Sequence, residues 1–305
     1  MFKDFLIVRA YLAGWAIVRF LPEKTAYSLF SWLGRYSVRR NGKSVQRLRG
    51  NLSRVVLNLT SKDLDLLVER AMASYMRYWC DTFRSPDWSN ESIASRVSCT
   101  NEEYLSGPMK NGEGVIVALP HAGNWDLAGA YFASKGFPLV TVAERLKPEA
   151  LFERFLQHRQ SLGMEVLPLD NRAMGTLIQR ARAKNLIALV ADRDISSSGV
   201  PVNFFAGRAK MPAGPALLAI RTGVPLVTAF VSYTKTGIHI DFKKISMPTE
   251  GTEQVKLNAI VQKCADNFAI GIKEHPEDWH MLQKIWSEDA VSEDDVRIDK
   301  TEESA

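Results

Sequence analysis

The residues best suited to chemistry lie in two short polar segments, each directly after a run of apolar residues. His121–Asp126 follows the apolar run Val115–Leu119, and Asp192-Arg193-Asp194 follows Leu186–Ala191. An imidazole has an unperturbed pKa of about 6.5, so it can accept a proton from a hydroxyl near neutral pH. We therefore expect His121 to act as a general base.

Two carboxylates could orient the ring of His121 and stabilise the imidazolium that forms. Asp126 lies five positions further on and can reach back across a tight loop, whereas Asp192 follows the neighbouring strand. Asp126 could instead cap the helix that starts there, because a side-chain oxygen at an N-cap accepts a backbone N–H. These roles stay open, and Asp126 could hold two of them.

Other kinds of catalytic site lack their characteristic residues. The chain has no GxGxxG, GxxxxGK[ST] or GxSxG motif, which disfavours a nucleotide-binding loop and a serine hydrolase. No second His or Cys stands at metal-ligand spacing around His121, so no metal site is expected. A structural role is expected for the remaining histidines, which are His158, His239, His275 and His280. Three cysteines without a CxxC pair predict no disulfide scaffold and favour a reducing compartment.

The segments that must position these residues alternate between strand and helix patterns after residue 114. Expected strands are Val115–Leu119, Leu139–Ala143, Val166–Leu169, Leu186–Ala191 and Pro225–Val231, with Ile238–Phe242 as an edge or antiparallel strand. Expected helices between and after them are Asp126–Lys135, Pro148–Leu162, Arg172–Lys184, Ala213–Thr222 and Thr252–Lys273, with an irregular loop after Ala191. This alternation predicts an α/β fold: a mostly parallel central sheet flanked by helices on both faces. In such sheets ligands bind beyond the carboxyl ends of the strands, where both polar segments lie.

The chain is expected to form one domain over residues 1–287. Residues 1–100 show helical periodicity, over Glu23–Arg40, Lys43–Val56 and Ser61–Arg84, and are expected to pack on the sheet and face a membrane. Residues 114–287 would form the α/β catalytic part. Residues 288–305 hold eight acidic and two basic residues and are expected to be a disordered tail.

The N-terminal region is strongly basic. Residues 1–54 contain eleven Lys or Arg against two acidic residues. Phe5–Leu21 is apolar but only 17 residues long and interrupted by Arg9 and Arg19, too short to span a bilayer comfortably. The pattern fits an interfacial membrane helix that places Phe5, Leu12, Trp15 and Phe20 against apolar material, and equally a helix buried on its own domain. Basic residues interleaved with an apolar helix favour an anionic membrane surface over nucleic acid as partner.

Several stretches, taken in order, resemble one protein family. His121–Asp126 resembles the His-x4-Asp motif of lysophospholipid-type acyltransferases, in the branch that contains the bacterial lipid A late acyltransferases. The whole chain resembles more closely the actinobacterial phosphatidylinositol mannoside acyltransferases. The matching stretches are 13–22, 74–79, 121–130, 142–148, 192–194, 204–207, 211–215 and 275–280.

The resemblance implies transfer of a long acyl chain, typically palmitoyl, from acyl-CoA to the 6-hydroxyl of a mannose on phosphatidylinositol mannosides. The enzyme would be bound peripherally at the cytoplasmic face of the plasma membrane. Acyl-CoA would be a co-substrate, and no metal or prosthetic group is required. A lipid A-type acceptor, a glucosamine disaccharide, remains an alternative, and a non-catalytic protein that binds anionic membranes remains another.

The resemblance also implies roles for individual residues. His121 corresponds to the catalytic base, and Asp192 to its acidic partner, which is more often Glu in the family. Glu144, Arg145 and Arg159 correspond to polar positions that line the donor and acceptor site. Arg193 is a further substrate-binding candidate, although it could equally pair with a neighbouring acid.

Acyl transfer also needs an oxyanion donor and an apolar groove for the tail. Backbone N–H groups after His121 or near Gly123 are candidate oxyanion donors. Phe132, Phe204 and Phe205 could line the groove together with apolar residues of the strands.

Overall fold

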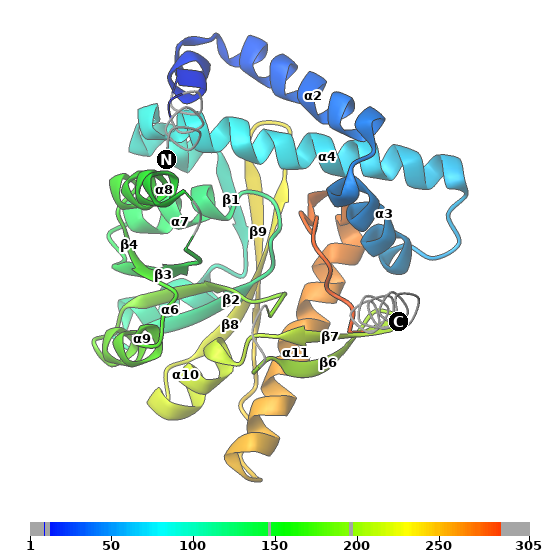
Figure 1. Ribbon diagram of the computed structural model, residues 1–305. Helices are drawn as coiled ribbons and strands as arrows, with labels where there is room; N and C mark the ends of the chain where they lie inside the picture. Colours follow the sequence, from blue (N-terminus) through cyan, green and yellow to red (C-terminus); the bar gives the residue numbers. More distant parts are fainter. Residues whose placement is uncertain (1–8, 10–12, 146–147, 195–197, 288–305) are drawn as a thin grey trace, which may run out of the picture.

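A seven-stranded sheet lies at the centre of the molecule. The computed structural model describes residues 9, 13–145, 148–194 and 198–287 (Figure 1). The strands are ordered β1-β9-β8-β2-β5-β3-β4, and all neighbouring pairs are parallel except β8 and β9. Their bounds are β1 Val97–Thr100, β2 Val115–Leu119, β3 Leu139–Ala143, β4 Met164–Pro168, β5 Leu186–Val190, β8 Leu226–Tyr233 and β9 Ile238–Lys244.

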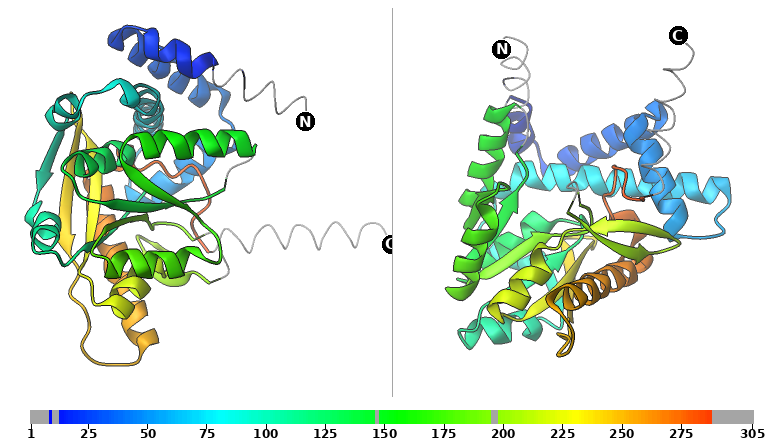
Figure 2. Two further views of the ribbon diagram at one scale, coloured as in Figure 1. Left: turned by 90° about the vertical axis from the view of Figure 1, so that its left-hand side faces the viewer. Right: turned by 60° about the horizontal axis from the view of Figure 1, so that its bottom comes forward.

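Helices cover both faces of this sheet (Figures 1 and 2). One face packs against α9 (Ala173–Arg182), α10 (Gly214–Thr222) and α11 (Glu253–Glu274). The other face packs against α5 (Asn90–Ser95), α6 (Glu103–Lys110), α7 (Trp125–Ser134) and α8 (Glu149–Ser161). The predicted α/β class, with a mostly parallel sheet covered on both faces, is therefore confirmed.

The central strand β2 shows why its sequence reads as a continuous apolar run. All five residues of Val115–Leu119 are buried. Ile116 and Ala118 belong to the core on the α10 and α11 face, whereas Val117 and Leu119 belong to the core on the α7 face. A strand in the middle of a parallel sheet has no solvent-exposed side, and so it carries no polar alternation.

Three N-terminal helices pack beside the sheet. They are α2 (Glu23–Arg40), α3 (Lys43–Val55) and α4 (Ser61–Arg84), close to the predicted ranges. Figure 1 shows the long helix α4 running across the end of the sheet, with α2 and α3 packed on it. Because Ser74 and Tyr78 of α4 hydrogen-bond residues of the catalytic part, these helices form part of the site's surroundings.

Two parts of the fold differ from the sequence expectation. The strand β1 forms an edge of the sheet within a region expected to be helical, so Ile238–Phe242 of β9 is antiparallel to β8 but is not the edge. The loop expected after Ala191 contains an antiparallel hairpin of β6 (Val200–Phe204) and β7 (Gly207–Met211).

The N-terminal segment packs on the protein with one side only. Residues 13–20 are helical, with Trp15 and Val18 buried and Ile17 and Phe20 exposed. Trp15 was expected to meet apolar material and does so within the protein, where it packs on Phe83. Phe5, Leu12 and the acidic tail at 288–305 lie outside the described residues. Among the helices of the described residues, none has the length and hydropathy needed to cross a bilayer.

Candidate active site

The first polar segment meets the second at the carboxyl ends of two neighbouring parallel strands. β2 and β5 pair with Leu119 opposite Val190, so the residues that follow them lie side by side. Nδ1 of His121 lies 2.6 Å from Oδ1 of Asp192, and the backbone N–H of His121 donates to Oδ2 at 3.0 Å. The side chain of His121 is 36% exposed and that of Asp192 is 0% exposed. The ring can therefore be reached from outside, while its partner is shielded from water.

The surroundings of Asp192 favour its charged form. Burial alone would raise the pKa of this carboxyl, but the charge of His121 and hydrogen bonds from His121 and Trp279 hold its pKa below the ordinary value. The indole N–H of Trp279 donates to Oδ2 at 2.9 Å. An ionised acceptor next to Nδ1 keeps the ring proton on that nitrogen and leaves Nε2 able to accept a proton.

The loop that carries His121 depends on glycine at position 123. Gly123 has φ +56°, and a Cβ atom there would lie 2.5 Å from the carbonyl oxygen of Val231 on β8. No other residue fits this close approach without a shift of the backbone. Gly123 therefore holds the loop against the sheet.

The backbone N–H groups expected as oxyanion donors are already used. Ala122 donates to the carbonyl of Pro120 at 2.8 Å, and Gly123 donates to that of Asp278 at 2.9 Å. The N–H of His121 itself is bound to Asp192. These bonds hold the loop in place and leave none of the three groups free for an oxyanion in this conformation.

Asp126 makes a different set of contacts from those of Asp192. Its oxygens accept from Nε of Arg159 on α8 at 2.8 Å and from the hydroxyl of Tyr78 on α4 at 2.9 Å. It does not cap α7 with its side chain, since Asn124 accepts the N–H of Leu127 in that role. The ring of His121 is thus held by Asp192. Asp126, which lies on α7, instead links this helix to α8 through Arg159 and to α4 through Tyr78.

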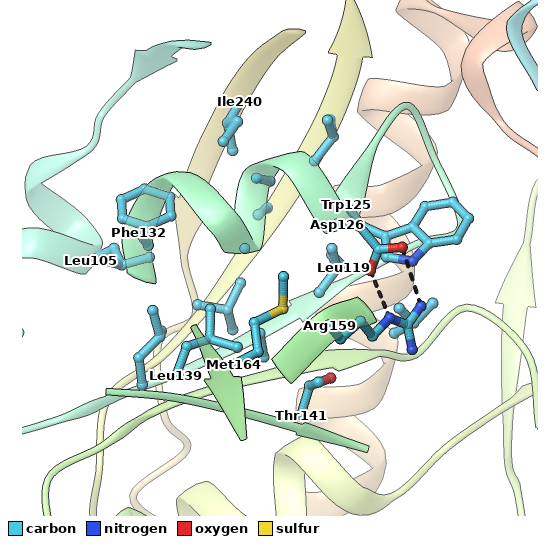
Figure 3. Close-up of a pocket in the computed structure, with 18 of the residues that line it drawn as sticks. Leu105, Leu119, Trp125, Asp126, Phe132, Leu139, Thr141, Arg159, Met164 and Ile240 are labelled. Carbon is cyan, nitrogen blue, oxygen red and sulfur yellow. Dashed lines mark hydrogen bonds and ion pairs between the residues drawn. The ribbon is translucent and has the colours of Figure 1, made fainter. Parts of the chain in front are cut away.

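A narrow apolar cavity of about 70 Å³ extends from Asp126 and Arg159 between α7 and the sheet. Figure 3 shows Trp125, Asp126 and Arg159 at one end, Leu105 and Phe132 at the other, and Met164 between them. Its walls are mostly apolar side chains of β2, β3, β5, β8 and β9 and of α7. A buried, apolar space with few polar groups at one end is typical of sites for elongated apolar ligands.

Trp125 connects this cavity to the histidine. Its indole lines the cavity and also meets the ring of His121 edge-on, with ring centroids 5.5 Å apart. On its other side it stacks on Tyr78 at 4.2 Å. The polar end of the cavity is therefore separated from His121 by the indole of Trp125, and His121 does not itself line the cavity.

Of the three aromatic residues expected to line a groove, Phe132 does so and two do not. Phe204 and Phe205 belong to the opposite face of the sheet, where Phe204 packs against Trp279 and Trp286. Both residues lie at the turn of the hairpin β6–β7, where an irregular loop was expected, and this hairpin packs on the opposite face.

The remaining predicted residues surround the site more loosely. Glu144 follows β3, and its carboxylate lies 4.0 Å from the guanidinium of Arg193, which follows β5. Arg193 therefore has the acidic neighbour that the sequence analysis considered. Arg145 is exposed and pairs with Glu149 at the start of α8, where its charge faces solvent.

Sequence reasoning gave no site role to His280, which lies close to His121. The backbone N–H of His280 donates to the carbonyl of His121 at 2.7 Å. Nε2 of its ring lies 2.9 Å from the hydroxyl of Ser74, and burial lowers its pKa to about 3, with the charge of His121 adding to the effect. The stretch 275–280 was visible in the sequence only as part of the family resemblance.

Comparisons with known proteins show which proteins this chain is similar to. The family model of bacterial lipid A biosynthesis acyltransferases matches residues 3–288. The phosphatidylinositol mannoside acyltransferase of Mycolicibacterium smegmatis is 39% identical over 291 residues, which cover 94% of each chain. The protein of the same name from Mycobacterium tuberculosis (strain CDC 1551) is 38% identical over 285 residues, covering 92% of this chain and 88% of that one.

Proposed function

The chain belongs to the bacterial lipid A biosynthesis acyltransferase family, and we propose that this acyltransferase moves a palmitoyl-type chain from acyl-CoA to the 6-hydroxyl of a mannose in phosphatidylinositol mannosides. The acceptor is suggested by the names of its relatives, which cover nearly the whole chain. Family membership makes the chain an enzyme, so the non-catalytic alternative is set aside.

The observation that carries the proposal is the pairing of exposed His121 with buried Asp192 beside the polar end of an apolar cavity. Nε2 of His121 takes the proton of the mannose hydroxyl while that oxygen attacks the thioester carbonyl carbon. The C–S bond then breaks, and the imidazolium returns its proton to the departing CoA thiolate. The products are a mannose ester and free CoA, and no acyl group is attached to the enzyme.

The ionised Asp192 supports this proton transfer in two ways. It holds Nδ1–H, so that Nε2 presents a lone pair to the hydroxyl, and it offsets the positive charge that the ring gains. Positioned bases of this kind contribute about 10²–10⁴-fold to a rate. Asp192 can fill the role despite being one methylene shorter than Glu, because its carboxylate already lies 2.6 Å from the ring.

The apolar lining of the cavity suits an acyl chain as donor. At about 70 Å³ the cavity is smaller than the range of about 300–1,000 Å³ found for ligand sites, so a palmitoyl tail would have to widen it. An acyl tail in this space would be shielded from water, and its thioester would lie at the Trp125 end, next to His121. Asp126 and Arg159 hold that end in shape and are proposed to border the reacting groups.

The charged residues outside the cavity are proposed to bind the polar parts of the substrates. Arg193, near Asp192, and Glu144, its neighbour, offer one donor group and one acceptor group to sugar hydroxyls. Arg145, with its exposed guanidinium, is suited to a phosphate of either substrate.

We further propose that the protein binds peripherally to an anionic membrane, at the cytoplasmic face of the plasma membrane. The surface formed by residues 13–40 exposes large apolar side chains, namely Ile17, Phe20, Leu29, Trp32 and Tyr36. The rings of Trp32 and Tyr36 stack at 5.7 Å, and Arg35, Arg39 and Arg40 are exposed on the same helix. Exposed aromatic residues flanked by arginine favour the headgroup region of a bilayer over nucleic acid.

Vesicle binding tests this membrane proposal. The double variant Trp32→Ser, Tyr36→Ser should bind phosphatidylglycerol-containing vesicles about tenfold more weakly. Each of the two rings would bury apolar area in the bilayer on binding, and serine would not. Val255→Ser, which changes an exposed apolar residue on α11, should bind like the wild type. Stronger, salt-dependent binding to nucleic acid than to these vesicles would contradict the proposal.

A second acceptor is considered because the family description names lipid A biosynthesis. The purified full chain is incubated with palmitoyl-CoA and either a phosphatidylinositol mannoside or a glucosamine disaccharide lipid. Mass spectrometry of the products should show one added palmitoyl group on the mannoside alone, with fragmentation placing it on a mannose. Acylation of the disaccharide at an equal or greater rate would replace the proposed acceptor.

A further inference from the structure

A segment from the far end of the chain lies against the loop that carries His121. Residues 278–280 follow α11, the orange helix in Figure 1, and return to the carboxyl edge of the sheet. Asp278 and His280 exchange backbone hydrogen bonds with Gly123 and His121, and Trp279 forms a bridge with Ala122. The loop of the proposed base is thus paired along its length with a segment more than 150 residues away in sequence.

Within the part of the chain that the structure describes, Trp279 is the residue of this segment whose side chain hydrogen-bonds Asp192. It is 0% exposed, and its N–H donates to Oδ2 of Asp192 at 2.9 Å. The same oxygen accepts the backbone N–H of His121, so Oδ2 has two donors while Oδ1 faces the ring. With both lone-pair sites of Oδ2 occupied, rotation of the carboxylate would break two hydrogen bonds in a dry environment.

We propose that Trp279 is a positioning residue that fixes the Asp192 carboxylate, and through it the ring of His121, for proton transfer. This inference rests on the proposed function, because it assigns Trp279 a part in the action of His121. Without the indole N–H, one lone pair of Oδ2 has no donor in a buried site, and the carboxylate can turn between two orientations. The ring then spends part of its time with Nε2 misdirected or protonated.

Loss of the indole N–H also changes the electrostatics of the pair. The hydrogen bond from Trp279 is one of the causes that lower the pKa of Asp192. Its removal raises that pKa, so Asp192 takes up a proton at a higher pH and then no longer accepts the Nδ1–H bond of the ring. The acidic limb of the rate profile is therefore expected to move to higher pH.

Trp286 provides a control, because it is also a buried tryptophan on this face of the sheet but its N–H has a different hydrogen-bond partner. Its ring is 3% exposed, packs on Phe204 like that of Trp279, and donates its N–H to the side chain of Asn51 at 2.9 Å. A purely structural role for the two indoles predicts the same kinetic effect for both Trp→Phe substitutions. A positioning role predicts an effect on proton transfer for Trp279→Phe alone.

The experiment measures palmitoyl transfer by the full chain as a function of pH in the wild type, Trp279→Phe and Trp286→Phe. Trp279→Phe should lower kcat by about tenfold to hundredfold, leave KM for palmitoyl-CoA within about twofold, and shift the acidic limb upward. Trp286→Phe should keep the wild-type kcat and profile. Equal losses in both variants, or an unchanged kcat and profile in Trp279→Phe, would overturn the proposal.

Two further measurements separate this proposal from its premise and from misfolding. An active His121→Ala variant would refute the proposed function itself, whatever Trp279→Phe does. If Trp279→Phe does not fold, a tryptophan analogue with ring sulfur in place of N–H is placed at position 279. In either altered protein, NMR of isotope-labelled histidine should show the Nδ1–H tautomer of His121 less populated than in the wild type; an unchanged tautomer would contradict the proposal.

Discussion

Two buried carboxylates lie near the same edge of the sheet, and they differ in the charge of the side chain that each one contacts. Asp192 faces an imidazole that can gain and lose a proton, whereas Asp126 faces the permanently charged guanidinium of Arg159. Both are almost inaccessible to water. The Asp192 region can therefore change its charge during a reaction, while the Asp126 region keeps a fixed ion pair between α7 and α8.

The comparison shows that proximity in sequence is a poor guide to which acid serves the base. Asp126 stands five residues from His121, and Asp192 stands 71 residues away. α7 begins at Trp125, so Asp126 lies in its first turn and points toward α8 and α4. The parallel pairing of β2 and β5 brings Asp192 to the ring instead.

Among substitutions of the two carboxylates, the larger effect on rate is expected from Asp192→Asn. The amide oxygen can keep the N–H bonds of His121 and Trp279, but the NH₂ group then donates to Nδ1 and leaves the proton on Nε2. That tautomer cannot accept a proton from a hydroxyl, so kcat should fall about 10²–10⁴-fold. Palmitoyl transfer and urea unfolding are measured on the same preparation. A kcat within tenfold of the wild type would assign the ring to another partner.

Asp126→Asn should affect stability more than rate. It leaves the guanidinium of Arg159 without its counter-charge in a mostly buried place, which costs about 3–5 kcal/mol of unfolding free energy. Glu165→Gln is the control, because it breaks the more exposed pair with Arg180, and exposed ion pairs contribute little to stability. Equal destabilisation in the two variants would show that the Asp126 pair is not structural.

The pH dependence of stability tests the group that lies between the two regions. His280 contacts both Tyr78 and Trp125, and burial lowers its pKa to about 3, whereas an unfolded histidine titrates near about 6.5. Below about pH 6.5 the unfolded chain therefore binds a proton that the folded chain does not. Stability should fall toward pH 3 by up to about 1.4 kcal/mol per pH unit from this residue.

His280→Asn should remove that contribution. The free energy of unfolding is compared between pH 7 and pH 5 in the wild type and the variant. Burial also lowers the pKa of His158, but that residue is common to both proteins and cancels in the difference. The same loss of stability in both proteins would show that His280 is protonated in the folded state.

The smallest effect concerns the cavity that extends from the Asp126 region. A Cβ at Gly129 would lie 3.0 Å from the end of the Met164 side chain, so Gly129→Val should narrow the space and disfavour long acyl chains. We expect the preference for palmitoyl over decanoyl transfer to fall about tenfold, or about 1.4 kcal/mol. Gly175→Val, with open space around its Cβ, should leave the preference unchanged. An unaltered preference in Gly129→Val would place the tail elsewhere.

The sequence predicted those parts of the fold in which local pattern and tertiary environment agree. Buried strands such as β2 are recognised by a continuous apolar run, and long amphipathic helices such as α4 by apolar residues at helical spacing. The strand β1 has only four residues and alternates between half-buried and exposed, which is a weak signal. The hairpin β6–β7 turns at Phe205 and Ala206, with Phe205 at φ +50°, instead of the Asn-Gly pair typical of such turns.

The site was predictable only as far as the carboxyl ends of strands could be located. Because ligands bind beyond the carboxyl ends of parallel strands, both His121 and Asp192 could be predicted as site residues. This rule could not decide between Asp192 and Asp126, because the choice depends on the pairing of β2 with β5 and on the position of α8. Nor could it find Trp279, whose indole reaches Asp192 from a segment without strand or helix periodicity.

Palmitoyl transfer by His121→Ala is the most direct test of the central claim, that this imidazole takes the proton of the acceptor hydroxyl. The full-length variant is assayed with palmitoyl-CoA and a phosphatidylinositol mannoside, beside His239→Ala, which removes a histidine from β9. We expect His121→Ala to lose at least about a thousandfold in kcat while keeping its unfolding midpoint and its affinity for palmitoyl-CoA, and His239→Ala to retain wild-type transfer. A folded His121→Ala protein that transfers palmitate within tenfold of the wild-type rate would contradict the claim.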